Sequence, residues 1–103
     1  MEQLRFDTAM FSQVGGRREN QDCCDYLVQD LRGCWVLADG LGGHQGGRVA
    51  ARIAVSAALD AFRVNAECSI DAVARYLASA NSAIVTAQRC DPALISMRTT
   101  AVI

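Results

Sequence analysis

The fold is decided by residues 34–47, which read Cys-Trp-Val-Leu-Ala-Asp-Gly-Leu-Gly-Gly-His-Gln-Gly-Gly. Apolar residues fill the first five positions, and such a run is typical of a central strand that is covered on both faces. Asp39 follows directly, and five of the eight glycines in the chain lie between Gly40 and Gly47. We therefore predict a buried strand that holds the carboxylate of Asp39 at its end, beside a glycine-rich turn.

Further strands are expected on both sides of this stretch. Alternating apolar residues predict a strand over residues 4–13, and residues 24–30 predict a second one. The short connection at residues 31–33 then leads into the strand at 34–38, so these two strands should form a hairpin. Residues 99–103 are β-formers and predict a fourth strand.

Two helices are expected between the glycine-rich turn and the last strand. Residues 47–62 are rich in alanine and carry apolar residues at helical spacing. Residues 69–88 show a second apolar stripe, with Ser69 as N-cap and Asp71 in the first turn. Pro92, the only proline, should close this helix.

The order of these elements indicates the fold class. A parallel doubly wound sheet needs a helix between consecutive strands, and the connection at residues 31–33 leaves no room for one. We therefore predict an α+β fold, in which helices pack on a mainly antiparallel sheet. A chain of 103 residues allows one domain or part of one.

Composition narrows the possible partners. The chain is 51% hydrophobic and 20% charged, which is typical of a folded protein. All ten basic residues are arginine, and they are scattered among eleven acids, so neither a nucleic-acid partner nor a basic binding face is expected. The N-terminus has no apolar signal core and no run is long enough to span a bilayer. These features predict a cytoplasmic protein without membrane association.

The cysteines show no functional pattern in the sequence. Their count is odd, and none of them form a CxxC pair: Cys23, Cys24, Cys34, Cys68 and Cys90. A zinc site and a disulfide framework are therefore not expected. Reduced thiols in a cytosol fit this usage best.

The chemistry expected at Asp39 is metal binding. Glycine allows the backbone to approach a ligand closely, and carboxylate and carbonyl oxygens favour Mg²⁺ or Mn²⁺ over zinc. Alternatively, Asp39 caps a turn and the glycines only provide a flexible connection. A third interpretation is a loosened dinucleotide fingerprint with Asp60 as the ribose acid, but Gln45 occupies the third glycine position of that motif.

A second polar segment lies at residues 15–22. Arg17 or Arg18 could hold a phosphate through the two-pronged guanidinium, and Asp22 could supply a second carboxylate to a metal or to metal-bound water. Taken alone, the segment could equally be a solvated loop of alternating charges.

Together these segments resemble the metal-dependent type 2C (PPM-type) serine/threonine protein phosphatases, particularly the short bacterial members. Residues 17–22 stand in the register of a family segment that reads Arg, two residues, Asn, Glu, Asp. Residues 39–44 match Asp-Gly-Met-Gly-Gly-His with one conservative change, and residues 98–100 take the place of a later Gly-Thr-Thr. The resemblance covers essentially the whole chain, so residues 1–103 are identified as part of one phosphatase domain.

The resemblance implies a fold, a site and an activity. The fold would be the N-terminal half of a four-layer αββα sandwich. Asp39 would bridge two Mg²⁺ or Mn²⁺ ions, the Gly40 carbonyl would bind one of them, and a metal-activated water would attack a phosphoserine or phosphothreonine of a protein substrate. Arg17 would hold the phosphate and Asp22 would orient metal-bound water or contribute to the second ion. His44, the only histidine, would act as an acid or order the glycine turn.

The chain departs from the family pattern at three positions and in its length. Gln21 replaces a Glu, Arg98 replaces a Gly, and Leu41 stands where some members carry a histidine. The family domain needs over twice this many residues, and its other metal-binding aspartates lie in the remaining half. We therefore expect a fragment with little or no activity. The alternatives are an inactive phosphatase-like module that binds a phosphoprotein, and a nucleotide-binding fragment that uses the Gly40–Gly47 loop.

Overall fold

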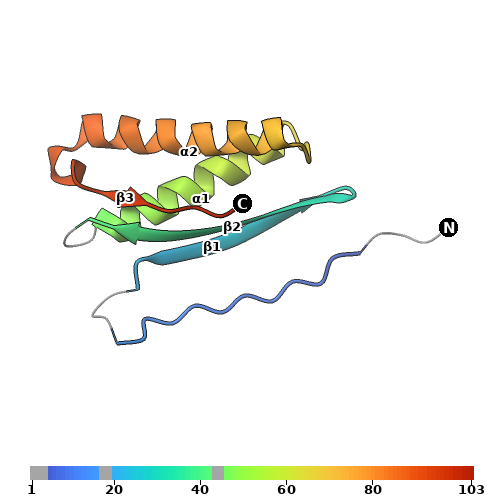
Figure 1. The fold of residues 1–103 in the computed structure, drawn as a ribbon, viewed down its shortest axis with the longest axis horizontal. Coiled ribbons are helices and arrows are strands. Elements are labelled where there is room, and N and C mark those ends of the chain that lie inside the picture. The colour runs from blue at the N-terminus through green and yellow to red at the C-terminus, as the bar shows by residue number, and fades with distance from the viewer. Residues whose placement is uncertain (1–4, 17–19, 43–45) are drawn as a thin grey trace.

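The computed structural model describes residues 5–16, 20–42 and 46–103. Its elements are, in order, β1 (Asp22–Gln29), β2 (Arg32–Leu41), α1 (Gly46–Val64), α2 (Ile70–Cys90), the short 3-10 helix η1 (Pro92–Leu94) and β3 (Arg98–Thr99). The strands form one antiparallel sheet in the order β1-β2-β3, and both helices lie on the same side of it (Figure 1). The predicted α+β class is confirmed.

The hairpin between β1 and β2 is tighter than the sequence suggested. Gln29 pairs with Arg32, so only Asp30 and Leu31 form the turn. Asp30 has a φ of 56°, a left-handed conformation that aspartate tolerates better than most residues. The prediction that residues 31–33 connect the strands was wrong, because Arg32 and Gly33 belong to β2.

The core lies between β2 and α1. The side chains of Cys34, Val36 and Ala38 are buried on the face of β2 that meets α1. Helix α1 supplies the opposite side of this core with small alanines and larger apolar residues: Ala51, Val55, Ala58, Leu59 and Phe62. Helix α2 packs mainly against α1, with Tyr76 against the ring of Phe62 at a centroid distance of 6.0 Å.

The opposite face of β2 is only partly covered. Trp35 and Leu37 are 37% and 51% exposed, so the prediction of a strand buried on both faces was wrong for the described residues. Alternating exposure along β2 gives the reason, because the helices cover one face only. We call the face that carries Asp22, Tyr26, Trp35, Leu37 and Asp39 the open face.

The N-terminal segment runs past the open face without joining the sheet. Residues 5–14 belong to no strand, so a strand over residues 4–13 was a wrong prediction for its described part. The segment runs on the side of the sheet away from the helices (Figure 1). It contacts the sheet through side chains. Phe6 packs edge-on against Trp35 at 5.2 Å between ring centroids, and Thr8 Oγ1 accepts a hydrogen bond of 3.0 Å from Trp35 Nε1.

The remaining predictions of elements agree closely with the structure. Ser69 caps α2, its hydroxyl accepting a hydrogen bond from the Ala72 N–H, and the helix ends two residues before Pro92. The expected last strand is partly present, as β3 and an isolated bridge between Leu37 and Val102. Within the described part of the chain, no helix has the length and apolar character needed to cross a membrane.

Candidate metal site at the end of the hairpin

The hairpin register places the two candidate carboxylates directly opposite each other. Asp22 of β1 pairs with Asp39 of β2, and side chains at paired positions point to the same face of a sheet. Their Cβ atoms are therefore about 4.5–5.5 Å apart. Ala38 and Gly40, the neighbours of Asp39 in β2, are buried beneath α1, so both carboxylates lie on the open face.

The backbone of Asp39 is fixed by the third sequence motif. Its carbonyl accepts hydrogen bonds from the Thr100 N–H at 3.0 Å and from Thr100 Oγ1 at 3.4 Å. Next to it, Gly40 pairs with Thr99 in the sheet. The two threonines thus hold the end of β2 in place from the side opposite β1.

Glycines at the end of β2 allow α1 to begin against the strand, on the face opposite the Asp39 side chain. A Cβ atom added to Gly40 would lie 1.8 Å from the carbonyl oxygen of Gly47, in the first turn of α1. Gly42 has a φ of 149°, and a Cβ there would lie 2.5 Å from the Cα of Met97. At these positions the interpretation of the glycines as a merely flexible connection is wrong, because each is required by close backbone contact.

The polar segment before β1 joins the same cluster. The Gln21 carbonyl accepts a hydrogen bond of 3.1 Å from the Gly40 N–H, and Gln21 Oε1 lies 2.3 Å from the place of a Cβ on Gly47. Asn20 Oδ1 accepts a hydrogen bond of 3.0 Å from the Asp22 N–H and so fixes the entry into β1. Because the N–H and C=O of a strand residue point to the same side, the Gly40 carbonyl is directed toward β1.

The electrostatics of the pair suit a divalent cation. Like charges at directly opposed positions of a sheet destabilise it, and a bound cation between them would remove that cost. The carboxylates of Asp22 and Asp39 and the Gly40 carbonyl are hard oxygen donors, the type that Mg²⁺ and Mn²⁺ select. The donor type therefore fits these ions. The donor number is incomplete, because the described residues contain no group of three or more His, Cys, Asp or Glu side chains placed to hold a metal.

Two of the predicted site residues lie outside the described residues. These are Arg17 and His44, and their proposed roles stay predictions. The adjoining segments at 20–22 and 40–42 are described and meet where β1 begins and β2 ends.

Gln88 is a structural residue that the sequence did not reveal. Its side-chain amide, in the last turn of α2, donates to the carbonyls of Leu94, Ile95 and Met97 at 3.3, 3.2 and 3.0 Å. These contacts shape the loop that leads into β3, and Thr100, directly after β3, makes the hydrogen bonds to Asp39. A long amide side chain just before Pro92 is the only sequence signal for this role.

Comparison with known proteins identifies the family. The family model for protein phosphatase 2C matches residues 13–103, which include the Asp22–Asp39 pair together with Thr99 and Thr100. The chain belongs to the protein phosphatase 2C family. A search of curated proteins found no match.

A solved structure agrees with this family in fold. The chain is similar to the crystal structure of the Mycobacterium tuberculosis serine/threonine phosphatase PstP/Ppp, with a TM-score of 0.63 and 24% sequence identity. The alignment covers 87% of this phosphatase 2C chain and 36% of that chain. The dinucleotide-binding interpretation is wrong, because β2 is antiparallel to both neighbours and the βαβ unit of that motif is missing from the described sheet.

Proposed function

We propose that this chain serves in the hydrolysis of phosphoserine and phosphothreonine in proteins, with Asp22 and Asp39 as ligands of Mg²⁺ or Mn²⁺. The observation that carries the proposal is the register of the hairpin, which sets these carboxylates opposite each other on the open face. Membership of the phosphatase 2C family supports the same reaction class.

The proposed roles of Asp39 and Asp22 follow from their positions in the hairpin. Asp39 lies in the central strand, and its backbone is held by β1 on one side and by Thr100 on the other. Asp22 faces it and would orient a water molecule or share an ion. Bound ions would supply a water that is nucleophilic at neutral pH and would offset the charge of the phosphate. Arg17 is proposed to hold the phosphate oxygens, and His44 to protonate the leaving group or to order the glycine turn.

We expect the activity of this chain by itself to be low. The chain spans 36% of the length of the mycobacterial phosphatase, and its described residues bring together only two carboxylates. We therefore expect weak metal binding and slow turnover of a small phosphate ester. The same observation favours a second candidate function, in which a phosphatase-like module binds a phosphorylated protein without hydrolysing it.

Metal binding tests the proposed ligands directly. Titration of the chain with Mn²⁺, followed by the electron paramagnetic resonance signal of the free ion, should give an affinity that falls at least about tenfold in Asp39→Asn. The matched control is Asp30→Asn, which makes the same charge change in the turn at the other end of the hairpin, about 26 Å along β1. Asparagine also suits the left-handed backbone of residue 30. Equal Mn²⁺ affinities of the two variants would contradict the assignment of Asp39.

A phosphothreonine peptide separates catalysis from binding. With Mn²⁺ present, release of inorganic phosphate that is lost in Asp39→Asn would establish a catalytic chain. Binding of the peptide without phosphate release would favour the non-catalytic module. If the wild-type chain neither binds the peptide nor releases phosphate from it, both proposed functions are contradicted.

A further inference from the structure

The tip of the β1–β2 hairpin is tied to the loop between α1 and α2. Gln29 Nε2 donates to the Arg63 carbonyl at 3.3 Å, and Arg32 Nη1 donates to the Ala66 carbonyl. Cys34 follows Arg32 by two residues in β2, so the two side chains lie on the same face of the strand. Cys68 follows Ala66 by two residues in the loop. The two hydrogen bonds therefore bring the two cysteines to the same place in the fold.

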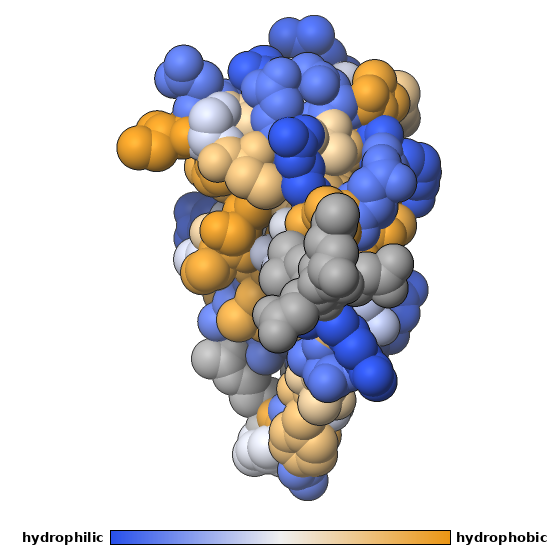
Figure 2. Space-filling view, turned by 90° about the vertical axis from the view of Figure 1, so that its right-hand side faces the viewer, coloured by the Kyte–Doolittle hydropathy of each residue, from blue (hydrophilic) through white to orange (hydrophobic). Residues whose placement is uncertain are grey.

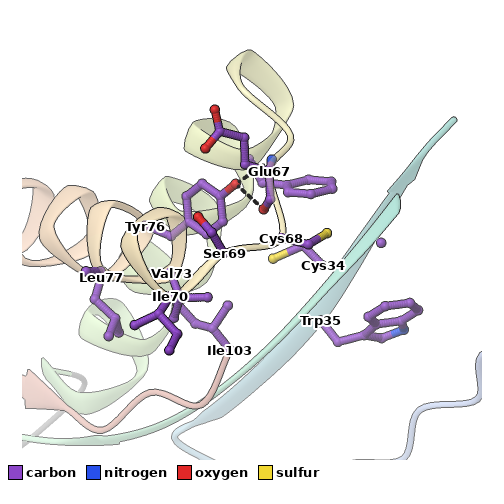
Figure 3. A pocket seen from close by; sticks show the side chains of 13 residues that line it. Cys34, Trp35, Glu67, Cys68, Ser69, Ile70, Val73, Tyr76, Leu77 and Ile103 are labelled. Carbon is purple, nitrogen blue, oxygen red and sulfur yellow. Dashed lines mark hydrogen bonds between the residues drawn. The ribbon is translucent and has the colours of Figure 1, made fainter. Parts of the chain in front are cut away.

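A pocket of about 610 Å³ lies between β2 and the start of α2, and both cysteines line it. Figure 3 shows their side chains between the strand and the loop that leads into α2. Figure 2, which views this end of the molecule, shows hydrophobic residues on its left side. Cys34 is 6% exposed and Cys68 is exposed, so one thiol forms part of the core and the other is open to solvent.

The electrostatics also indicate that the two sulfurs are close. Burial raises the pKa of the Cys34 thiol, and the negative charge of the Cys68 thiolate raises it further. A Coulombic influence weakens with distance, so this one agrees with the placement of both thiols at one pocket. All five cysteines of the chain are free.

We propose that Cys34 and Cys68 form an oxidation site, at which a peroxide converts the two thiols into a disulfide between β2 and the α1–α2 loop. The Cys68 thiol gives up its proton, and its sulfur attacks one peroxide oxygen. The O–O bond breaks, Cys68 becomes a sulfenic acid, and the other oxygen leaves as hydroxide, which takes up that proton to form water. The Cys34 sulfur then attacks the Cys68 sulfur, the S–O bond breaks, and a second water leaves with the Cys34 proton. In sum, two thiols lose two electrons and the peroxide gains them.

The order of the two steps follows from exposure. Cys68 meets the dissolved oxidant first because it is at the surface. Cys34 is shielded from the oxidant but lies at the same pocket, so it is the resolving thiol. The disulfide would close a loop from residue 34 to residue 68, joining the start of β2 to the loop that Arg32 already contacts.

Peptide mapping tests this proposal cleanly, because arginines separate the cysteines. Trypsin releases Cys34 in the peptide 33–48 and Cys68 in the peptide 64–75, and the other three cysteines are in different peptides. After treatment of the native chain with hydrogen peroxide and alkylation of the remaining thiols, we expect one dominant linked species that joins these two peptides. Dithiothreitol should release it. The same treatment in concentrated urea should give mixed pairings instead.

Two serine variants serve as a matched pair, since both positions are exposed and neither is in the core. Cys68→Ser should abolish the linked species and leave Cys34 open to alkylation after unfolding, whereas Cys90→Ser should leave the link unchanged. Oxidation should also raise the melting temperature of the chain by about 10 °C, an increase that Cys68→Ser should lack. A dominant link from Cys68 to any other cysteine, a link between two chains, or a fully alkylated Cys34 would overturn the proposal.

Discussion

The position of the Asp39 carboxylate depends on residues that have no side chain. Gly40 and Gly47 bring the end of β2 against the first turn of α1, with no room for a methyl group between them. The sequence indicated that the glycines allow another group to come close to the backbone, but it did not show which part of the chain that group belongs to. In the described structure the partner is the backbone of α1 and the side chain of Gln21. These contacts hold the backbone behind Asp22 and Asp39, on the helix side of the sheet.

Gly40→Ala tests this close contact. The added Cβ would lie 1.8 Å from the Gly47 carbonyl oxygen, so either α1 or the end of β2 must move. We expect a loss of about 2–3 kcal/mol in the free energy of unfolding, measured by urea denaturation. Gly16→Ala is the matched control, because nothing lies within 4 Å of its added Cβ, and it should change stability by less than about 1 kcal/mol. Equal effects of the two substitutions would contradict the packing described for Gly40.

Glu67 gives the chain a pH dependence in the acid range. A hydrogen bond from Arg75, at 2.9 Å, and the charge of that guanidinium lower the pKa of the Glu67 carboxyl from its ordinary value of 4.5. A lowered folded-state pKa contributes stability above the unfolded-state pKa, and this contribution is lost as the pH falls through the folded-state pKa. Glu67→Gln should therefore lower the melting temperature slightly at pH 7, and the difference between the two proteins should shrink as the pH falls through the folded-state pKa of Glu67.

The pKa itself can be followed by NMR. The side-chain carboxyl signal of Glu67 should titrate below pH 4.5 in the wild-type chain and at a higher pH in Arg75→Gln, where the hydrogen bond and the positive charge are gone. An identical titration in both proteins would show that Arg75 does not hold the carboxylate.

At the level of elements, the sequence predicted the helices better than the strand pairing. The apolar stripe and the capping residue Ser69 locate α2 within two residues, because both signals act within one element. The alternation in residues 4–13 shows only that one side of the segment is apolar. It does not say whether the backbone finds a partner, and the described residues 5–14 find none.

The candidate site depended on a register that the sequence left open. A connection over residues 31–33 would pair Asp30 with Cys34, and that register sets Asp25 rather than Asp22 opposite Asp39. The actual turn of Asp30 and Leu31 shifts the pairing and brings Asp22 to Asp39. The family resemblance named both residues, but only the turn geometry explains why they meet.

Tyr76 is the residue that fastens α2 to the loop after α1. Its hydroxyl is buried, donates toward the carbonyls of Asn65 and Glu67 at 3.0 and 2.8 Å, and accepts from the Glu67 N–H at 3.0 Å. Tyr76→Phe keeps the contact with Phe62 but leaves these backbone groups without their partner. We expect a loss of about 1–2 kcal/mol in the free energy of unfolding by urea denaturation.

Tyr26→Phe is the matched control for Tyr76. It removes the same hydroxyl from a side chain that is 39% exposed on the open face, so it should change the free energy of unfolding by less than about 0.5 kcal/mol. If Tyr76→Phe lowered the free energy of unfolding as little as Tyr26→Phe, the loop after α1 would not depend on the hydroxyl of Tyr76.

At the scale of the whole molecule, the two faces of the sheet differ. The helices cover one face, and the other carries the two candidate metal ligands together with exposed apolar side chains. The resemblance to the phosphatase 2C sandwich implies that a second sheet packs on such a face. The apolar run at residues 34–38 agrees with cover on both faces, but a run of residue types cannot show where the covering residues lie. A metal site on this face would take its further ligands from whatever covers it.

The open face should also govern the solution behaviour of the isolated chain. Several large apolar side chains are at least one third exposed there, and the described N-terminal segment covers only part of them: Tyr26, Val28, Trp35, Leu37 and Leu41. Contiguous exposed apolar surface drives association, because its burial is worth about 25 cal/mol per Å². We therefore expect the chain to self-associate with rising concentration in sedimentation velocity experiments.

Leu37→Lys should weaken this association several-fold, because it sets a charge in the middle of the open face. The fold should persist, since the side chain points away from α1 and the backbone hydrogen bonds between Leu37 and Val102, of 2.9 and 2.8 Å, do not need it. Val64→Lys is the matched control: it makes the same charge change at a residue that is 88% exposed at the end of α1, on the helix side of the sheet, and should leave association unchanged. A wild-type chain that stays monomeric at all concentrations, or equal effects of the two lysines, would show that the open face is not the surface that associates.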